Sequence, residues 1–265
     1  MKKNIAFDAK KATDEIVDFI REYFGKYNLK GIVLGISGGK DSAVVAGLFC
    51  KALGSENVIG LTLPCHSNEQ DKIDAEVVSK HFNFKLLNLD ITDVYDTFTS
   101  EFDKNFNPLG IYSNDLTDSN INIKPRLRML SVYYVAQALS QFEKQGYLVA
   151  GTSNKCELYV GYFTKGGDNV HDINVIGDLT VKEVLAVGDY IGVPKNVLYK
   201  IPHDGISKQS DEEKMGIKYD DVEKVIYGEA VEEEAYHKIQ SLHNRNAHKF
   251  NIPTYRKELM KVSSE

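Results

Sequence analysis

The chain has 265 residues, 42% of them hydrophobic, so it can bury an ordinary core, and we expect one domain over residues 1–265. Its net charge of −6 argues against nucleic-acid binding, which needs an excess of Lys and Arg. The three cysteines are dispersed, which argues against a disulfide framework. The sequence has no uncharged run close to the ~20 residues that a membrane helix needs. We therefore expect a cytoplasmic protein.

Helical and strand patterns alternate along the chain. Apolar residues from Ile16 to Phe24 recur at helical spacing, and Gly31 then precedes IVLGI, a run typical of a buried parallel strand. Such repetition predicts a parallel sheet covered on both faces. The later elements are a helix at Ala43 to Leu53, a strand at Val58 to Leu63, a helix at Asp71 to Phe82, a strand at Phe84 to Leu89, a helical stripe from Met129 to Phe142, a strand at Tyr147 to Ala150, a helix at Val181 to Ile191 and a charged helical tail from Asp220.

The segment 153–177 departs from this alternation. It is rich in glycine and charge and has little periodicity, which favours a lid or binding loop. In open α/β sheets, ligands bind beyond the carboxyl ends of the strands. Ser37, Pro64 and Thr152 are therefore expected at one edge of the sheet.

A glycine-rich turn follows the first strand. Ser37, Gly38 and Gly39 open the next helix, so their backbone N–H groups can form an anion nest at the positive end of the helix dipole. The spacing fits neither a Walker loop nor the GxGxxG dinucleotide fingerprint. Asp41 would repel a phosphate unless a divalent cation lay between them, and Mg²⁺ prefers oxygen ligands. The alternative is that Asp41 is an ordinary acid in the first turn of a helix.

The SGGKDS sequence at 37–42 resembles the PP-loop of ATP pyrophosphatases, which split ATP into AMP and pyrophosphate by adenylating a substrate. From the first helix to about Lys249, the chain resembles NAD synthetases, with motifs in order at 122–129, 151–157, 161–168, 172–174 and 211–216. This resemblance implies a Rossmann-like, doubly wound parallel sheet of the adenine nucleotide alpha hydrolase type, with a helical C-terminal tail.

The resemblance also implies a reaction. ATP would activate the nicotinate carboxylate of deamido-NAD as an acyl-adenylate, which ammonia attacks to give NAD, AMP and pyrophosphate. Because the chain is too short for the amidase domain of glutamine-using relatives, ammonia is the expected nitrogen donor. The implied cofactor is Mg²⁺, and the implied assembly is a homodimer that builds the deamido-NAD site at its two-fold interface. Such chemistry needs no protein nucleophile, only positioning and electrostatic stabilisation.

The same resemblance assigns residues. Asp41, Glu157 and Lys165 are the expected catalytic residues, and Asp41 and Glu157 the metal ligands. The expected ATP-binding residues are Gly35, Ile36, Ser37, Gly38, Gly39, Lys40, Asp41, Ser42, Thr152, Lys182 and His203. The expected deamido-NAD residues are Arg126, Lys165, Asp172, His248 and Lys249. Without the motifs, the same side chains would be read as surface charges, a mobile lysine and a capping aspartate.

Two positions depart from the family pattern. The family has a lysine where this chain has Val181, so Lys182 either takes over that ATP contact or the contact is lost. His203 stands where a Ser or Thr usually follows the proline, and it either contacts phosphate or fills space. Arg126 and Arg128, two apart at an expected helix start, should point to opposite sides. The resemblance selects Arg126 for deamido-NAD, and we expect Arg128 to anchor structure.

Two other functions compete with this interpretation. A tRNA-modifying thiolase or lysidine synthetase would share SGGKDS, but clustered cysteines and a basic stripe are absent from the sequence. A non-catalytic ATP-binding module would keep the fold without the second carboxylate and the lid lysine. Glu157 and Lys165 are both present, which favours an enzyme.

Overall fold

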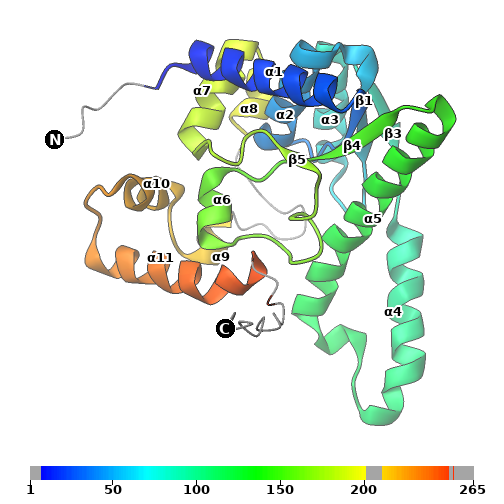
Figure 1. Ribbon diagram of the computed structural model, residues 1–265. Coiled ribbons are helices and arrows are strands. Elements are labelled where there is room, and N and C mark those ends of the chain that lie inside the picture. Colours follow the sequence, from blue (N-terminus) through cyan, green and yellow to red (C-terminus); the bar gives the residue numbers. More distant parts are fainter. Residues whose placement is uncertain (1–6, 201–210, 251–252, 254–265) are drawn as a thin grey trace, which may run out of the picture.

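A computed structural model describes residues 7–200, 211–250 and 253 of the chain (Figure 1). Its strands are β1 (Leu29–Gly35), β2 (Val58–Thr62), β3 (Lys85–Asn88), β4 (Gly146–Gly151) and β5 (Ile173–Asn174). Its α-helices are α1 (Ala9–Lys26), α2 (Lys40–Leu53), α3 (Glu69–Phe82), α4 (Thr92–Phe106), α5 (Thr117–Glu143), α6 (Lys155–Val160), α7 (Val181–Ile191), α8 (Lys195–Leu198), α9 (Asp211–Met215), α10 (Tyr219–Tyr227) and α11 (Glu233–Asn246). Short 3₁₀ turns occur at Ser55–Asn57, Asn107–Leu109, Ser113–Asp115 and Ala247–Lys249.

The strands form one parallel sheet in the order β3-β2-β1-β4-β5. The central strand β1 is buried from both sides. Ile32 and Leu34 pack into the core on one face and Val33 into the core on the other, as the two-residue period of a strand requires. The predicted parallel sheet with both faces covered is confirmed, and an apolar run without polar alternation is its sequence cause.

Different helices cover the two faces of the sheet. On one face α1, α2 and α7 pack against one another over a core that includes Phe24, Val44 and Phe49. On the other face the long helix α5 packs on β1 and β4 through Leu127, Val132 and other apolar residues. Helix α4 runs beside α5 and extends away from the sheet (Figure 1).

A third, smaller cluster lies apart from the sheet. Helices α6, α10 and α11 pack around Cys156, Val160, Tyr219, Val222 and Ile239. In Figure 1, α11 lies below α6, and both border the space in front of the carboxyl ends of the strands. The C-terminal part of the chain therefore supplies a second wall facing the edge of the sheet.

Three details of the expected elements differ from the structure. The segment 153–177 is not one irregular loop, because it contains α6 and the short strand β5. Arg126 and Arg128 do not stand at a helix start, since α5 begins at Thr117 and continues through Pro125. Burial of the apolar stripe of α5 on the sheet stabilises the helix by more free energy than is lost with the backbone hydrogen bond that a proline removes. Helix α4 was not predicted.

Candidate functional site

The glycine turn connects β1 to α2 at the carboxyl edge of the sheet. Gly38 has φ of +76°, and a Cβ there would lie 2.5 Å from the carbonyl oxygen of Asp71, so only glycine fits. The Ser42 hydroxyl donates to the Gly39 carbonyl and accepts from the Ser37 N–H, at 3.1 and 3.3 Å. These bonds fix a tight turn at the start of α2, the place in a fold where a phosphate turn occurs.

Two cavities open at this edge. The larger, of about 850 Å³, is lined by the glycine turn, α6, parts of α5 and α11, and the chain around Gly161 to Thr164. The smaller, of about 370 Å³, is lined mainly by apolar residues and backbone at the ends of β1, β2 and β4. Ser37 and Thr152 line both cavities and Pro64 lines the smaller one, so the expected meeting of three strand ends is confirmed.

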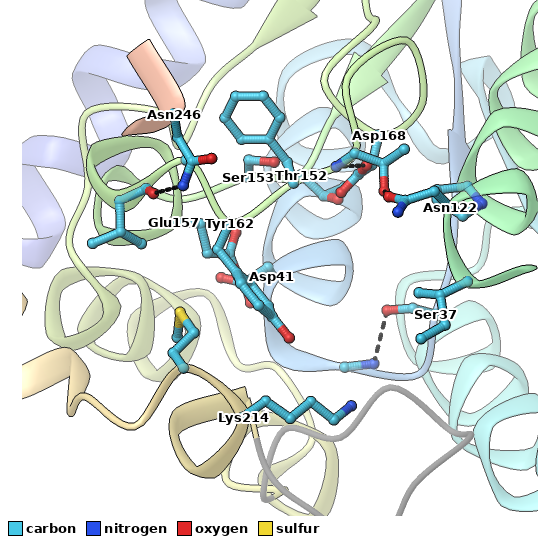
Figure 2. Close-up of a pocket in the computed structure, with 18 of the residues that line it drawn as sticks. Ser37, Asp41, Asn122, Thr152, Ser153, Glu157, Tyr162, Asp168, Lys214 and Asn246 are labelled. Atoms are coloured by element: carbon cyan, nitrogen blue, oxygen red, sulfur yellow. Dashed lines mark hydrogen bonds between the residues drawn. The ribbon is translucent and has the colours of Figure 1, made fainter. Parts of the chain in front are cut away.

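Asp41 occupies the first turn of α2 and projects into the larger cavity (Figure 2). Its Oδ2 pairs with the Lys40 ammonium at 2.9 Å, and its Oδ1 accepts a hydrogen bond from the side chain of Asn154 at 3.2 Å. Glu157 lines the same cavity, and its Oε2 accepts from the Asn154 backbone N–H at 3.1 Å. The structure thus brings the two predicted metal ligands to one cavity.

Asn154 holds this arrangement together and was missed by the sequence analysis. It is fully buried and caps α6, where its Oδ1 accepts from the backbone N–H groups of Cys156 and Glu157. Its Nδ2 is the atom bonded to Asp41. The signal was present, because Asn154 and Glu157 form the N-x-x-E pattern of a capping box.

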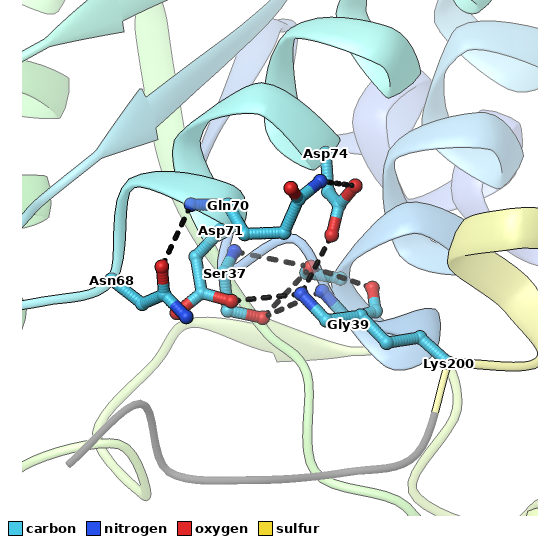
Figure 3. Close-up of polar contacts among 8 residues, drawn as sticks. Ser37, Gly39, Asn68, Gln70, Asp71, Asp74 and Lys200 are labelled. Carbon is cyan, nitrogen blue, oxygen red and sulfur yellow. Dashed lines mark hydrogen bonds and ion pairs between the residues drawn. The ribbon is translucent and has the colours of Figure 1, made fainter.

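A cluster of one lysine and two aspartates, Lys200, Asp71 and Asp74, lies at the rim of the glycine turn (Figure 3). The Lys200 ammonium is 2.8 Å from Asp71 Oδ1 and 2.6 Å from Asp74 Oδ2, both on α3. These two ion pairs raise the pKa of Lys200 despite partial burial, which lowers it, so the side chain stays charged. Lys200 lines the larger cavity and was not predicted.

Lys182 forms ion pairs away from the two cavities, so we predict that the missing family contact to ATP is lost. Its ammonium pairs with Asp220 at 3.0 Å and Glu223 at 3.6 Å, and the side chain lines neither cavity. The reason is local, because position 182 of α7 faces α10 rather than the sheet edge. His203 lies outside the described residues.

Four of the predicted deamido-NAD residues, Arg126, Lys165, His248 and Lys249, lie near one another. Arg126 donates through Nε and Nη2 to the Lys165 carbonyl, at 3.3 and 3.2 Å, and the Lys165 ammonium donates to the His248 carbonyl at 3.0 Å. The Lys249 ammonium donates to the carbonyls of Gly161 and Phe163, at 2.7 and 2.8 Å. Three segments distant in sequence therefore meet, but only Lys249 of this group lines the larger cavity.

Asp172 is engaged elsewhere. Its two carboxylate oxygens accept from the Tyr133 hydroxyl at 3.0 Å and the Val149 N–H at 2.8 Å. It lines neither cavity and here joins α5 to the end of β4. Arg126 and Arg128 do point to opposite sides of α5, as expected, since Arg128 donates to the Leu63 carbonyl at 3.2 Å.

Comparison with known proteins gives consistent matches along the chain. Residues 12–253 match the protein-family model described as NAD synthase. The chain is 41% identical over 223 residues to the NH(3)-dependent NAD(+) synthetase of Methanococcus aeolicus, covering 81% of this chain and 80% of that protein. It is 37% identical over 242 residues to the protein of that name from Carboxydothermus hydrogenoformans, covering 91% and 95%.

A solved structure described as NMN synthetase from Francisella tularensis is also similar. It is 32% identical in sequence and superposes with a TM-score of 0.83. The match covers 95% of this chain and 99% of that one. The arrangement of sheet, glycine turn and C-terminal helices is therefore shared at full length.

Proposed function

The chain belongs to the NAD synthase family, and we propose that it catalyses the ATP-dependent amidation of deamido-NAD by ammonia, a ligase reaction that forms a C–N bond. The observation that carries this proposal is the family match over residues 12–253, together with the meeting of the glycine turn, Asp41 and Glu157 at one cavity. The competing tRNA-modifying and non-catalytic functions have no comparable support.

The two cavities suit the two parts of ATP. The smaller cavity, with apolar walls that include Leu61, Val132 and Val149, is suited to the flat adenine ring. The glycine turn at the base of the larger cavity is suited to the phosphates. In the reaction, an oxygen of the substrate carboxylate bonds to the α-phosphorus while the bond to the bridging oxygen breaks and its electron pair leaves with pyrophosphate. Ammonia then displaces AMP from the acyl carbon.

Mg²⁺ fits the side chains that would hold it. Among the residues that the structure describes, no three or more His, Cys, Asp or Glu side chains form a metal-binding group. Mg²⁺ nevertheless is usually bound by one or two carboxylates, with phosphate oxygens and water completing its octahedron. Asp41 and Glu157 are such carboxylates, and bound Mg²⁺ would neutralise charge on the phosphates. Lys40, which now pairs with Asp41, shows that a cation is accepted at this oxygen.

The direct test is formation of NAD from deamido-NAD, ATP and ammonium by the purified chain. We expect stoichiometric AMP and pyrophosphate, and no product when ATP is omitted. Glutamine in place of ammonium should give no turnover. ATP hydrolysis without NAD, or NAD formation without AMP, would contradict the proposed reaction.

A second candidate substrate is a mononucleotide. The similarity to a protein described as NMN synthetase, at a TM-score of 0.83, favours testing it. Nicotinate mononucleotide and deamido-NAD carry the same nicotinate carboxylate. The two functions therefore differ in which of these two acids the enzyme amidates. Measuring kcat/KM for both acids under the same conditions does this, and we expect deamido-NAD to be preferred at least tenfold.

We also propose a homodimer. Helices α4 and α5 and the chain between them expose many large apolar side chains, and an exposed apolar patch of this kind commonly marks a protein interface. These residues are Val94, Phe98, Leu109, Ile111, Ile121, Leu130 and Tyr134. Light scattering should give twice the chain mass, and Leu130→Asp with Tyr134→Asp should shift the protein toward monomer. A monomer in the unaltered protein at micromolar concentration would contradict this.

Two further expectations remain proposals. We propose that residues 1–265 form one catalytic domain and that the protein acts in the cytoplasm. The three cysteines are free thiols, as a reducing compartment would keep them. No helix within the described ranges is both long and apolar enough to cross a membrane.

A further inference from the structure

The two cavities meet at a neck that contains a single positive charge. Of the described residues, six line both cavities: Ser37, Asp71, Pro125, Arg128, Thr152 and Asp168. Arg128 is the one cation in this set, beside the carboxylates of Asp71 and Asp168. The charges of the neck are therefore not all negative. A phosphate that lies in the neck would be attracted by the Arg128 guanidinium.

Arg128 has more hydrogen-bonding capacity than its structural contact uses. Its Nε donates to the Leu63 carbonyl at the end of β2, at 3.2 Å. Neither Nη atom has a hydrogen-bond partner or an ion pair among residues 7–200, 211–250 and 253. Since neither Nη atom is among the buried polar atoms that lack a partner, both Nη atoms are accessible to solvent. The Arg128 side chain lines both cavities. An anchor for one carbonyl needs one donor, whereas a guanidinium supplies five.

The neighbouring cation Lys124 also lines the larger cavity, but it is buried and engaged with its own partners. Lys124 is 8% exposed, donates to the Cys65 carbonyl at 3.3 Å and lies 5.2 Å above the ring of Tyr95. Arg128 is mostly buried but keeps some exposed surface, and it lines both cavities. Loss of hydration lowers the pKa of the Arg128 guanidinium, and the charges of Asp168 and Asp71 offset this only in part.

We propose that Arg128 binds the α-phosphate of ATP, the centre at which the adenylate forms. This inference rests on the proposed function, in which adenine occupies the smaller cavity and the terminal phosphates the glycine turn. The neck then lies between adenosine and pyrophosphate, where the α-phosphate must be. A planar guanidinium presents parallel N–H donors to two phosphate oxygens, and this geometry suits the negative charge that develops as the substrate carboxylate attacks. Arg128 is on this basis a catalytic residue rather than the structural anchor expected from the sequence.

The test compares ligands that differ only by the α-phosphate. Calorimetric titration of the full-length protein with adenosine and with AMP gives the ratio of their dissociation constants. We expect Arg128→Met to reduce the preference for AMP by about 10- to 100-fold while changing the adenosine constant by less than about threefold. Arg21→Met is the matched control, because Arg21 Nε also donates to a carbonyl, that of Ala52, at 3.2 Å, yet the residue lines neither cavity.

The outcomes separate the alternatives. If Arg128 only anchored the end of β2, adenosine and AMP would lose affinity together, and this would overturn the proposal. An AMP preference unchanged in Arg128→Met, or absent from the unaltered protein, would overturn it as well. Should Arg128→Met fail to fold, Arg128→Lys keeps the charge but loses the paired donors, and it should still lower the AMP preference. Failure of the proposed amidation would appear separately, as absence of NAD formation by the unaltered protein.

Discussion

The two walls of the larger cavity are built in different ways. The wall formed by the glycine turn comes from one continuous stretch, residues 37–42, and α2 behind it packs into the main core through Val44, Val45 and Phe49, all fully buried. The opposite wall comes from α5, the chain around Gly161 to Phe163, and the end of α11. Its α11 part rests on the small cluster around Cys156 and Ile239, whereas α5 packs on the sheet.

The charged groups of the two walls also differ in the partners that they have in this structure. At the glycine turn, residues 37–42 line the cavity and Asp41 projects into it. On the opposite wall, the Lys249 ammonium is bonded to the carbonyls of Gly161 and Phe163. The side chains of Arg126 and Lys165, which line neither cavity, are bonded to backbone carbonyls as well. We expect Lys249 to exchange its carbonyls for substrate oxygens when deamido-NAD binds. On this proposal the first wall is preorganised for ATP and the second is adjustable.

The largest expected effect tests the preorganised wall. Asp41→Asn and Glu157→Gln keep side-chain volume but remove a carboxylate charge, and each should lower kcat about 100- to 1,000-fold, because each removes an electrostatic stabiliser of the transition state. Raising Mg²⁺ should restore part of the rate. NAD formation across a Mg²⁺ titration, with a thermal melt, measures both effects.

Asp178→Asn is the control for these variants. Asp178 pairs with Lys155 at 2.8 Å, its side chain is 95% exposed, and it lines neither cavity. Its substitution should change kcat less than about twofold. If Asp41 were only a helix-start acid, Asp41→Asn would cost about 0.3 to 1 kcal/mol of stability and leave turnover near normal.

The second effect compares two glycines with the same φ, one in the glycine turn and one in the chain that follows Lys165. Gly38 and Gly166 both have φ of +76°, but a Cβ at Gly38 would lie 2.5 Å from the Asp71 carbonyl, whereas nothing lies within 4 Å of one at Gly166. We expect Gly38→Ala to lower the free energy of unfolding by about 3 kcal/mol and to weaken ATP binding. Gly166→Ala should cost about 1 kcal/mol. Urea titrations of both variants measure this, and equal losses would refute the packing argument.

The third effect concerns the adjustable wall. Lys249→Met removes an ammonium that can move from the Gly161 and Phe163 carbonyls to the substrate. We expect KM for deamido-NAD to rise about tenfold, the cost of one charge-assisted hydrogen bond, and KM for ATP to change less than about twofold. Lys80→Met, on an exposed helical ion pair, is the control. Equal rises in both KM values would mean that the two walls are not functionally distinct.

The smallest effect separates two lysines, Lys200 beside the glycine turn and Lys182 on α7. Lys182 lines neither cavity, so Lys182→Met should leave KM for ATP within about twofold. Lys200→Met leaves Asp71 and Asp74 without their cation at the rim of the turn and should raise KM for ATP about three- to tenfold, more at low salt. Steady-state kinetics at two salt concentrations provide the measurement. The reverse order would show that Lys182 does reach ATP.

The sequence by itself determined the sheet, the glycine turn and the pair of carboxylates. IVLGI followed by SGGKDS predicts a buried parallel strand and a phosphate turn, because β-branched apolar residues, glycines and a helix start are local requirements. The resemblance of the ordered motifs predicted that Asp41 and Glu157 act together, and both line the larger cavity.

Only the tertiary structure decided which cations face that cavity. Lys200 reaches it because α3 holds its ammonium with two aspartates, whereas Lys182 is drawn to α10, and no local pattern distinguishes these two lysines. Likewise, Arg128 lines the neck because α5 extends nine residues before Arg126, from Thr117, and carries both arginines across the sheet. Long side chains reach whichever partner the fold brings near, so their roles depend on contacts between segments far apart in the sequence.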